Sequence, residues 1–353
     1  MAREVWTEQG LSVHGAALSG KAARGLMEAA AIPSTTLHRL VAQLNHGDIV
    51  LNDRTVVVLD EASMIGTRQL AQVVKHCSRG GASLVLCGDS RQIQVIGLGG
   101  LFAELTYRFE TSRLTDIQRQ REVWARESVK HFAFGRAEQA LLPYRERGLV
   151  AETPHEVIAM DQMVADWRRE ALPDLKGSVM LAGTTTEVIE LNQRAQEERR
   201  QLGLLCDTPV RTGPDTIFTG DRVLFTRNSM TVRVVNGDLG TVTASQNETL
   251  SVRLDDGREV RVPVEGYPHL RLGYAVTTHK AQGMTVERAF ILTGGIMTDR
   301  EITYVQASRA RGTTRWYVGH DLEETTRRMS RSHEKLAAVS LAEGPELELT
   351  LVR

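Results

Sequence analysis

Two apolar runs, each ending in acidic residues, place the strongest constraint on what this chain can fold into. Residues 55–63 read TVVVLDEAS and residues 82–90 read ASLVLCGDS, so in both segments apolar residues run without alternation into a carboxylate. Strands with this pattern are buried on both faces, which is typical of parallel sheets covered by helices. A helical pattern at 68–79 separates the two runs. The alternation, with polar residues at each strand's carboxyl end, predicts a doubly wound α/β sheet.

The segments around these runs extend the same α/β alternation. Upstream, the sequence predicts a short helix at 3–9, a buried strand at 11–18 and helical residues 21–46, broken at Ile32-Pro33-Ser34. Downstream, residues from about 121 to 172 have an amphipathic helical pattern. A strand at 178–183 and a helix at about 187–202 then begin a second α/β unit.

The pattern of residue types changes between residues 208 and 270, where apolar and polar residues alternate. Asn236-Gly237 and Asp256-Gly257 lie within this segment and are strong short hairpin signals. We therefore expect a small antiparallel β barrel inserted into the second unit. After it, the chain returns to α/β texture and ends in a charged, helical tail beyond His320.

Composition narrows the class of protein. A length of 353 residues predicts two or three compact units, and 41% hydrophobic with 25% charged residues is typical of globular proteins. With 43 Lys and Arg against 44 Asp and Glu, the net charge of −1 excludes a globally basic nucleic-acid coat but not a local basic groove. The three cysteines lack paired spacing, which argues against disulfides and zinc sites. We expect a soluble, cytoplasmic protein without a membrane span or signal segment.

Acidic and polar residues after the two apolar runs carry the first chemical signal. A carboxylate such as Asp60 at the end of a buried strand suits a hydrated Mg²⁺ held against nucleotide phosphates, and an adjacent one such as Glu61 suits activation of water. Gln92, in the GDSRQ segment after the next strand, is expected at the same sheet edge, where its amide suits contact with a γ-phosphate. An ordinary strand end or turn remains the alternative for each motif taken alone.

Five motifs in order give the chain a family resemblance. DEAS (60–63), GDSRQ (88–92), LTDIQRQ (114–120), YAVTTHKAQG (274–283) and YVQASRAR (304–311) resemble motifs II to VI of superfamily 1 DNA helicases of the RecD-like branch. The resemblance covers nearly the whole chain and is strongest to the helicase half of conjugative transfer relaxases of the TraA type. It implies two RecA-like lobes at 1–113 and at 114–207 with 271–320, an SH3-like insertion at 208–270 and a helical tail at 321–353.

The resemblance also implies roles in ATP hydrolysis. Asp60 would coordinate Mg²⁺, Glu61 would act as general base on the attacking water, and Gln92 would sense the γ-phosphate of ATP. Arg119 and Arg309 would act as arginine fingers, since phosphoryl transfer needs cations that stabilise charge on the transferring group. A solvated helix arginine is the alternative for Arg309. The assignment at Arg119 competes with three neighbouring arginines, Arg113, Arg121 and Arg126.

Further motif residues are expected at the nucleotide and on single-stranded DNA. By resemblance, Gln282 and Gly283 contribute to nucleotide binding, and translocation runs 5′ to 3′. Contacts to the DNA backbone are implied for two groups of residues, Ser19, Gly20 and Lys21 in motif Ia and Thr278, His279 and Lys280 in motif V. A packed, hydrogen-bonded histidine is the alternative for His279, and no second ligand at suitable spacing supports a metal there.

A phosphate-binding loop of the form GxxxxGK[ST] is missing from the sequence. The nearest match, residues 15–22, ends in Ala22, which has no hydroxyl for a metal ion. This segment stands where motif Ia belongs, although a degenerate phosphate loop or a plain strand-to-helix turn remain alternatives. The motif Ia interpretation places the first strand and the phosphate loop of the family upstream of Met1, leaves the sheet without a central strand, and makes ATP and Mg²⁺ binding by this chain alone doubtful.

The insertion offers two further candidates for DNA contact. Four arginines at 222, 227, 233 and 253 form either a basic face or a set of solvated side chains. Phe225 and Tyr267 suit either base stacking or, preferably, core packing.

Two functions of different classes follow. The first is an ATP-driven DNA translocase acting in conjugation, with an upstream relaxase or phosphate-loop segment as its partner. The second is a non-hydrolytic module that binds DNA or docks onto a partner.

Overall fold

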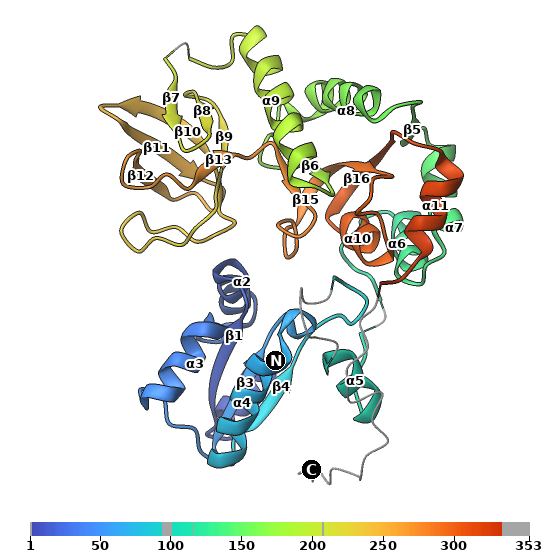
Figure 1. Ribbon diagram of the computed structural model, residues 1–353. Coiled ribbons are helices and arrows are strands. Elements are labelled where there is room, and N and C mark those ends of the chain that lie inside the picture. The colour runs from blue at the N-terminus through green and yellow to red at the C-terminus, as the bar shows by residue number, and fades with distance from the viewer. Residues whose placement is uncertain (1, 94–100, 115, 207, 334–353) are drawn as a thin grey trace. The chain divides into compact units, whose positions relative to one another are not determined.

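The chain forms two compact units. The computed structural model describes residues 2–93, 101–114, 116–206 and 208–333 (Figure 1). With these gaps, the first unit comprises residues 2–18 and 26–114, and the second comprises residues 19–25 and 115–333. Within the described residues, no helix has both the length and the apolarity needed to cross a membrane.

A four-stranded parallel sheet forms the centre of the first unit, with strand order β2-β1-β3-β4. Its strands are β1 (Ser12–Ala17), β2 (Ser34–Thr36), β3 (Thr55–Leu59) and β4 (Ser83–Leu86). The helices of this part of the chain are α1 (Ala2–Glu8), α2 (Gly20–Ala30), α3 (Leu37–His46), α4 (Thr67–Gly80) and α5 (Leu101–Arg108), and a 3₁₀ turn, η1 (Ala62–Met64), follows β3.

Strand β3 shows why an unbroken apolar run forms the centre of this sheet. All five of its residues are buried. Val57 and Leu59 face a cluster built with α3 and α4, whereas Val56 and Val58 face a second cluster on the opposite side of the sheet. Because successive side chains point to opposite faces, a strand covered on both faces must be apolar throughout. The predicted two-sided burial is confirmed.

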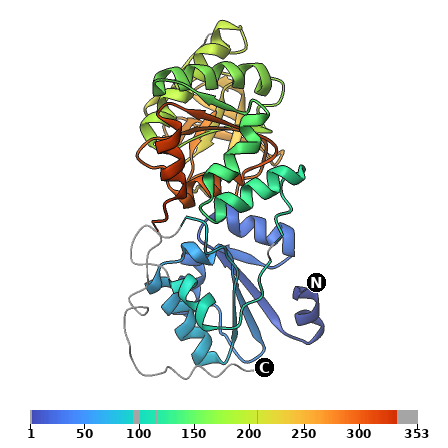
Figure 2. The same cartoon turned by 90° about the vertical axis from the view of Figure 1, so that its right-hand side faces the viewer.

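The second unit contains a five-stranded parallel sheet with order β14-β6-β15-β16-β5 (Figures 1 and 2). Its strands are β5 (Val150–Glu152), β6 (Ser178–Ala182), β14 (Ala275–Thr277), β15 (Val286–Thr293) and β16 (Ala310–Val318). The helices that accompany it are α6 (Val123–Ala133), α7 (Ala137–Glu146), α8 (Glu156–Ala171), α9 (Thr185–Gln201), α10 (Arg300–Ala307) and α11 (Leu322–Ser330).

Helices cover both faces of this sheet. In β6, Met180 packs in a cluster with residues of α8 and α9, and its neighbour Leu181 packs in another with residues of α6 and α7. In β15, Phe290 and Ile291 divide between the same two clusters. The α/β fold class with two parallel sheets is confirmed.

The predicted β insertion is also confirmed. Five strands form an antiparallel sheet of order β12-β11-β10-β9-β13, and two short strands form a separate pair. The sheet contains β9 (Arg222–Phe225), β10 (Leu239–Gln246), β11 (Thr249–Leu254), β12 (Glu259–Pro263) and β13 (Leu270–Leu272), and the pair is β7 (Val210–Thr212) with β8 (Asp215–Ile217).

The hairpin signals of the insertion have different outcomes. Gly257, at φ 91°, lies in the short connection between β11 and β12, as its sequence predicts. Asn236-Gly237 instead closes the end of a long connection between β9 and β10, where the N–H of Asp238 donates to the carbonyl of Val235 at 3.0 Å.

Two short strands depart from the sequence expectations. Residues 121–172, expected to be helical, form α6, α7 and α8 with β5 inserted between the last two. The Ile32-Pro33-Ser34 break is followed by β2, which pairs with β1. Both strands have three residues and lie at sheet edges. Such short segments carry too little periodicity to be distinguished from loops.

Candidate functional site

The carboxyl edge of the first sheet gathers the acidic motif residues. The N–H of Asp60 donates to the carbonyl of Ala16 at 2.9 Å, which continues the pairing of β3 with β1 by one residue. The Asp60 carboxylate accepts a hydrogen bond from the N–H of Glu61, also at 2.9 Å. Both acidic side chains are partly exposed. Two carboxylates therefore stand in succession where the sheet ends.

Glu61 has a left-handed backbone, with φ 52° and ψ 41°. For a residue with a Cβ this conformation is uncommon and costs about 1–3 kcal/mol. Glu61 precedes η1, so the chain turns sharply out of the sheet at this point. Strain of this kind clusters at functional sites, because the surrounding structure fixes a side chain in a direction that a relaxed turn would not give.

The GDSRQ segment lies against the acidic motif. The N–H of Ala62 donates to the carbonyl of Cys87 at 2.8 Å. A Cβ on Gly88 would come within 3.0 Å of the backbone nitrogens of Ala62 and Ser63, so the close approach of the two loops requires glycine there. This contact brings the segment containing Gln92 to the same sheet edge as Asp60, as the sequence predicts.

Asp89 organises the end of this loop. Its carboxylate accepts from the Arg91 N–H at 3.0 Å and from Gln92 Nε2 at 3.4 Å. The N–H of Gln92 also donates to the Asp89 carbonyl at 3.2 Å. These bonds hold the Gln92 side chain beside a carboxylate at the end of β4.

The donor set at this edge fits a Mg²⁺ ion but supplies no phosphate cradle. Mg²⁺ is commonly held by one or two carboxylates together with water and phosphate oxygens, so Asp60 is a suitable ligand without a larger cluster. Within the described ranges, no three His, Cys, Asp or Glu side chains gather as a metal-binding group.

The near match to a phosphate loop is part of a strand. Gly15 lies inside β1 and pairs with strands on both sides, opposite Ser34 and Val58. A Cβ on Gly15 would lie 2.1 Å from Ser34 Oγ, so glycine is needed for strand packing. Only Leu18 and Ser19 separate β1 from α2. That turn is too short to wrap a phosphate in backbone N–H groups, which argues against a degenerate phosphate loop at residues 15–22.

Ser19, Gly20 and Lys21 form the beginning of α2. Ser19 Oγ accepts from the Ala22 N–H at 3.0 Å and so caps the helix. Burial lowers the pKa of Lys21, an effect that Asp255 and Asp238 partly offset. In the same unit, Arg24 forms ion pairs with Asp238 at 3.3 Å and Asp256 at 3.2 Å. Nearby carboxylates thus reduce the positive charge that this segment presents to a phosphate.

Motif V connects β14 to β15 in the second unit. Thr278 is fully buried, and its hydroxyl donates to the Ala182 carbonyl at 3.3 Å and accepts from Gln306 Nε2 at 2.8 Å. His279 is partly buried, and burial lowers its pKa. Lys280 is exposed at the residue level, although partial burial of its side chain, followed by the charge of Arg271, lowers its pKa.

The rest of the motif V loop is more open. Gly283 has φ 75°, and a Cβ added to it would meet no atom within 4 Å. Gln282 is partly exposed, and its N–H donates to the His279 carbonyl at 3.3 Å. The loop therefore offers Lys280, Gln282 and Gly283 to solvent, whereas Thr278 is part of the interior.

Arg309 is almost completely buried, with 1% of its surface exposed. Its Nε donates to the Val305 carbonyl at 2.8 Å, and Nη1 donates to the carbonyls of Ala281 and Met284, each at 3.3 Å. Nη2 donates to Ser308 Oγ at 2.6 Å. In this conformation the guanidinium binds the motif V loop, a contact that the sequence patterns do not predict.

Arg119 lies beside this group. Its Nη1 donates to the carbonyl of Ser308 at 2.8 Å, although the residue as a whole is exposed. The neighbouring Gln120 is buried and donates from Nε2 to the Ala310 carbonyl at 3.0 Å. The structure thus brings Arg119 and the Arg309 segment together in one unit, as the two predicted fingers require.

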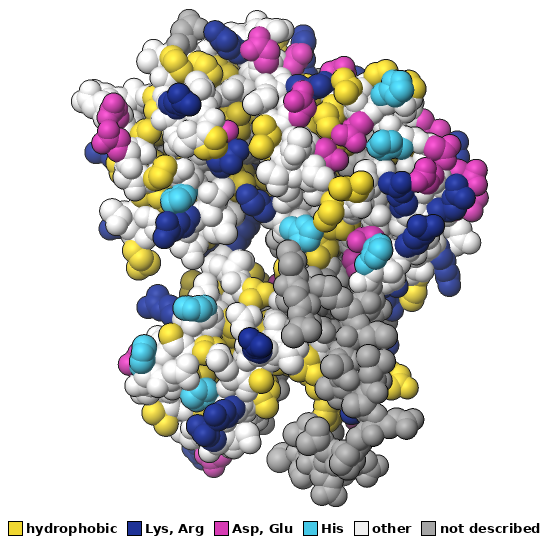
Figure 3. Space-filling view, in the orientation of Figure 1, with side chains coloured by type: hydrophobic (Ala, Val, Ile, Leu, Met, Phe, Trp, Pro, Cys, Tyr) yellow, Lys and Arg dark blue, Asp and Glu magenta, His cyan; other side chains and the backbone are white. Residues whose placement is uncertain are grey.

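The arginines of the insertion do not form one basic face. Arg222 is buried and pairs with Asp255, and Arg253 pairs with Glu259 at 2.8 Å. On the surface seen in Figure 3, acidic and basic side chains of the second unit are interspersed. Phe225 and Tyr267 are 0% and 4% exposed, which confirms that they pack in the core.

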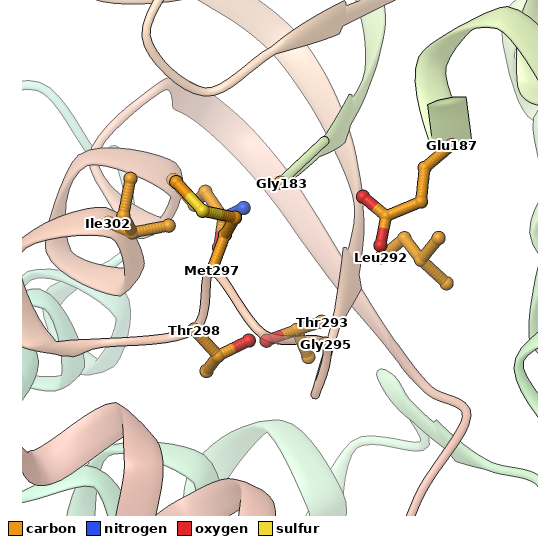
Figure 4. Close-up of a pocket in the computed structure, with 9 residues that line it drawn as sticks. Gly183, Glu187, Leu292, Thr293, Gly295, Met297, Thr298 and Ile302 are labelled. Carbon is orange, nitrogen blue, oxygen red and sulfur yellow. The ribbon is translucent and has the colours of Figure 1, made fainter. Parts of the chain in front are cut away.

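Two candidate site residues received no role from the sequence motifs, Gln306, which lies within YVQASRAR, and Glu187, which lies outside all five motifs. Both line a small cavity at the end of the second parallel sheet (Figure 4). The sequence offers a signal for Gln306, because it stands four residues after Ile302 on one face of α10, and an uncharged polar side chain on a buried helix face is unusual.

Comparison with known proteins gives consistent similarities. Residues 1–155 match the model of a family described as AAA domain. A conjugal transfer protein TraA from Agrobacterium fabrum is 36% identical over 324 residues, which cover 90% of this chain and 29% of that protein. An ATP-dependent RecD2 DNA helicase from Deinococcus radiodurans is 27% identical over 318 residues, covering 86% of this chain and 42% of the helicase. The chain thus spans less than a third of the TraA relative's length.

Solved structures share the fold. The crystal structure of a Bacteroides Pif1 bound to ssDNA superposes with a TM-score of 0.61 at 17% identity, covering 91% of this chain and 86% of that one. The Pif1 helicase of Candida albicans gives a TM-score of 0.55 at 17% identity, covering 96% of this chain and 97% of that one. At this identity the likeness establishes the arrangement of elements alone.

Proposed function

We propose that the chain, which is homologous over most of its length to TraA-type conjugal transfer proteins, is a superfamily 1 helicase region of the RecD-like branch that moves along single-stranded DNA from 5′ to 3′ using ATP. The proposal also limits the rate of ATP hydrolysis expected from this chain. The sequence contains no GxxxxGK[ST] loop, so hydrolysis by these 353 residues alone is expected to be weak.

The observation that carries this proposal is the close packing of the DEAS and GDSRQ loops. Gly88 lies against the backbone of Ala62 and Ser63, which supports a shared site for Asp60, Glu61 and Gln92. In this site Asp60 would hold Mg²⁺, which when bound would neutralise phosphate charge. Glu61 would accept the proton of the attacking water, and Gln92 would contact the γ-phosphate.

The second unit supports the transition-state part of the proposal. Arg119 contacts the carbonyl immediately before Arg309, so a movement of one arginine is transmitted to the other. Arg309 binds two carbonyls of the motif V loop, which also carries Lys280, Gln282 and Gly283. Release of Arg309 from these carbonyls would free its guanidinium for a phosphate and loosen the loop at the same time. Hydrolysis and DNA contact would be coupled through this exchange of hydrogen bonds.

Binding of DNA is tested by fluorescence anisotropy with a labelled oligonucleotide across a salt series. Affinity should fall with rising salt and change little with base order along a mixed sequence, because phosphate contacts dominate such binding. Absence of binding at low salt would remove the DNA-binding function.

Hydrolysis is tested by measuring phosphate release from ATP with and without single-stranded DNA. We expect slow turnover that Glu61→Gln abolishes, while Glu8→Gln, an exposed substitution on α1, leaves the rate unchanged. DNA-stimulated turnover at ordinary helicase rates would contradict the expected limit. If Lys21→Ala then removed that turnover, residues 15–22 would act as a phosphate loop after all.

A second candidate function is a non-hydrolytic module that grips DNA or a partner. Two observations favour it, namely the missing phosphate loop and the complete engagement of the Arg309 guanidinium by the chain's own oxygen atoms. The same assays separate the two functions. DNA binding without any Glu61-dependent hydrolysis supports the module, and Glu61-dependent hydrolysis supports the motor.

A further inference from the structure

A small cavity opens at the carboxyl end of the second parallel sheet, between the ends of β6 and β15 (Figure 4). Its volume is about 10 Å³, which is enough for one water molecule or one amino group. Polar side chains from two helices, Glu187 of α9 and Gln306 of α10, line it together with Thr293, Thr298 and Met297. The cavity accepts a single polar group and leaves the rest of any ligand outside.

The orientation of the Gln306 amide follows from its neighbours. Thr278 has one hydroxyl proton, which it donates to the carbonyl of Ala182. In this arrangement the hydroxyl accepts from Gln306 Nε2 at 2.8 Å, and Gln306 Oε1 is directed away from Thr278. Gln306 is 2% exposed, and among the described residues its Oε1 has no hydrogen-bond partner. A buried hydrogen-bond acceptor without a partner destabilises the protein by about 1–3 kcal/mol. A ligand group that donates a hydrogen bond to Gln306 Oε1 would remove this cost.

Glu187 adds a second acceptor. One carboxylate oxygen accepts from the N–H of Thr184 at 2.6 Å, which fixes the side chain at the beginning of α9. The other oxygen is turned toward Gly295, since a Cβ on that glycine would lie 3.1 Å from it. Figure 4 shows the carboxylate extending from α9 toward the cavity. No lysine, arginine or histidine is among the described residues that line it.

This arrangement is unsuited to a phosphate. The N-terminus of α9 is already capped by Thr184 and Glu187, and that of α10 is capped by the carboxylate of Asp299, which accepts from the Ile302 N–H at 2.7 Å. At each helix end a side chain of the chain itself already accepts from an N–H of the first turn, and a carboxylate, of Glu187 or of Asp299, places negative charge there. The cavity is suited to a ligand group that donates hydrogen bonds.

Two exposed apolar side chains adjoin the cavity along the chain, because Met297 lines it and Ile296 stands between Met297 and the lining residue Gly295. Ile296 is 88% exposed and Met297 is 39% exposed, both on the loop that follows β15. Large apolar side chains exposed beside a polar cavity mark a binding surface for a ligand with a flat apolar body and a polar edge. An unpaired nucleobase has this shape, and bases outside a duplex are held by stacking on side chains and by hydrogen bonds to their edges.

We propose that this cavity receives the exocyclic amino group of an unpaired cytosine, adenine or guanine, whose ring lies against Ile296 and Met297. The inference rests on the proposed function, because it requires single-stranded DNA as the ligand. The amino group donates to Gln306 Oε1 and to the Glu187 carboxylate. Thymine has no amino group and would turn a carbonyl oxygen toward these two acceptors, so it is disfavoured.

The test compares deoxycytidine and thymidine 12-mers, two pyrimidine strands of equal length, by fluorescence anisotropy at one low salt concentration. One net hydrogen bond changes a dissociation constant about 2- to 12-fold, so we expect the cytidine strand to bind tighter by about that factor. Replacement of cytidine by N4,N4-dimethylcytidine removes the N–H donors without altering the protein. That strand should bind no better than the thymidine strand.

Protein variants locate the effect. Gln306→Met keeps the side chain's length but removes the acceptor together with the donor to Thr278, and it should bring the affinities for the cytidine and thymidine strands to the same value. Gln201→Met, an exposed substitution on α9, should keep the preference. Equal binding of cytidine and thymidine strands by the unaltered protein would overturn the inference alone. Failure of both strands to bind would overturn the proposed DNA binding and the inference with it.

Discussion

Arg119 donates a hydrogen bond from Nη1 to the carbonyl oxygen of Ser308 at 2.8 Å. Ser308 directly precedes Arg309, whose guanidinium donates to three further carbonyls and to the Ser308 hydroxyl. Two motifs separated by nearly 190 positions are thus joined through one residue. This arrangement makes Arg309 part of the second unit's interior, with consequences for stability as well as chemistry.

Replacing Arg309 by alanine should therefore destabilise the protein. The substitution removes the guanidinium's hydrogen bonds to the carbonyls of Val305, Ala281 and Met284 and empties the buried space that its side chain fills, and we expect the free energy of unfolding to fall by about 2–4 kcal/mol. Urea denaturation measures the change. Arg311→Ala, at an exposed position two residues later, should alter stability by less than about 0.5 kcal/mol. Equal stability of the Arg309 variant and the control would show that these hydrogen bonds are not made in solution.

The sequence predicts the fold more fully than the chemistry of single side chains. The unbroken apolar run at 56–59 identified a buried strand, because burial on both faces favours apolar residues at successive positions. The DEAS and GDSRQ segments could be assigned to one sheet edge, since parallel strands end together. These conclusions depend on patterns that are local in the chain.

Features set by long-range contacts could not be read in this way. The burial of Thr278 depends on Gln306, which is 28 positions away, and Arg309 looks in the sequence like any helix arginine. The hairpin between β10 and β11 turns at Asn247 and Glu248, both at positive φ, although Glu is rarely found there. Tertiary packing determines the burial and the backbone conformation of such residues. A pattern in the sequence shows one residue of each contact and does not show its partner.

The stability of the protein should respond with opposite signs to alanine at two glycines, Gly15 inside β1 and Gly25 on the exposed side of α2. In Gly15→Ala the new Cβ would meet Ser34 Oγ, which is fixed by its bond to the Ile32 carbonyl, and would lie 2.9 Å from Ile32 Cγ2. We expect a loss of about 1–3 kcal/mol in the free energy of unfolding. In Gly25→Ala the Cβ meets no atom within 4 Å, and helix α2 should gain about 0.5–1 kcal/mol.

Thermal or urea unfolding of both glycine variants, prepared in parallel, tests this pair. A loss of stability in both would mean that α2 does not tolerate a methyl group at its exposed face. An unchanged stability in Gly15→Ala would contradict the close packing of β1 against β2.

Asp221 should give the stability of the protein a pH dependence of a particular sign. Its side chain is fully buried and accepts from the Tyr274 hydroxyl at 2.6 Å, the Phe218 N–H at 2.7 Å and Gln196 Nε2 at 2.6 Å. Burial raises its pKa above the ordinary 3.8, and the hydrogen bonds only partly offset this effect. As pH rises, the unfolded chain therefore loses this proton first, so stability falls between the unfolded and the folded pKa.

Asp221→Asn removes this titration. The free energy of unfolding of wild type minus that of the variant should decrease as pH rises above about 3.8 and become constant above the raised folded pKa. At neutral pH the variant should still be less stable, by about 1–3 kcal/mol, because its amide N–H faces groups that are themselves donors. A difference that grows with pH through this window would contradict the assignment.

Lys280 and His279 should contribute differently to DNA binding. Burial lowers the pKa of His279 below its ordinary 6.5, so this side chain is neutral between pH 7 and 8 and adds no charge to the loop. Lys280→Gln should reduce the salt dependence of ssDNA affinity by about 0.7 in the slope of log K against log salt concentration, the value for one lost phosphate contact. His279→Gln should leave this slope unchanged in the same pH range.

The pH dependence completes this comparison. Below the lowered pKa of His279 the imidazole gains a positive charge, so wild-type affinity for DNA should rise as pH falls through that value and should not rise in His279→Gln. Lys130→Gln, on α6 and already paired with Glu127 at 2.9 Å, serves as the control for loss of a lysine and should alter neither slope nor pH profile. Should Lys130→Gln and Lys280→Gln reduce the salt slope equally, binding would depend on overall charge rather than on the motif V loop.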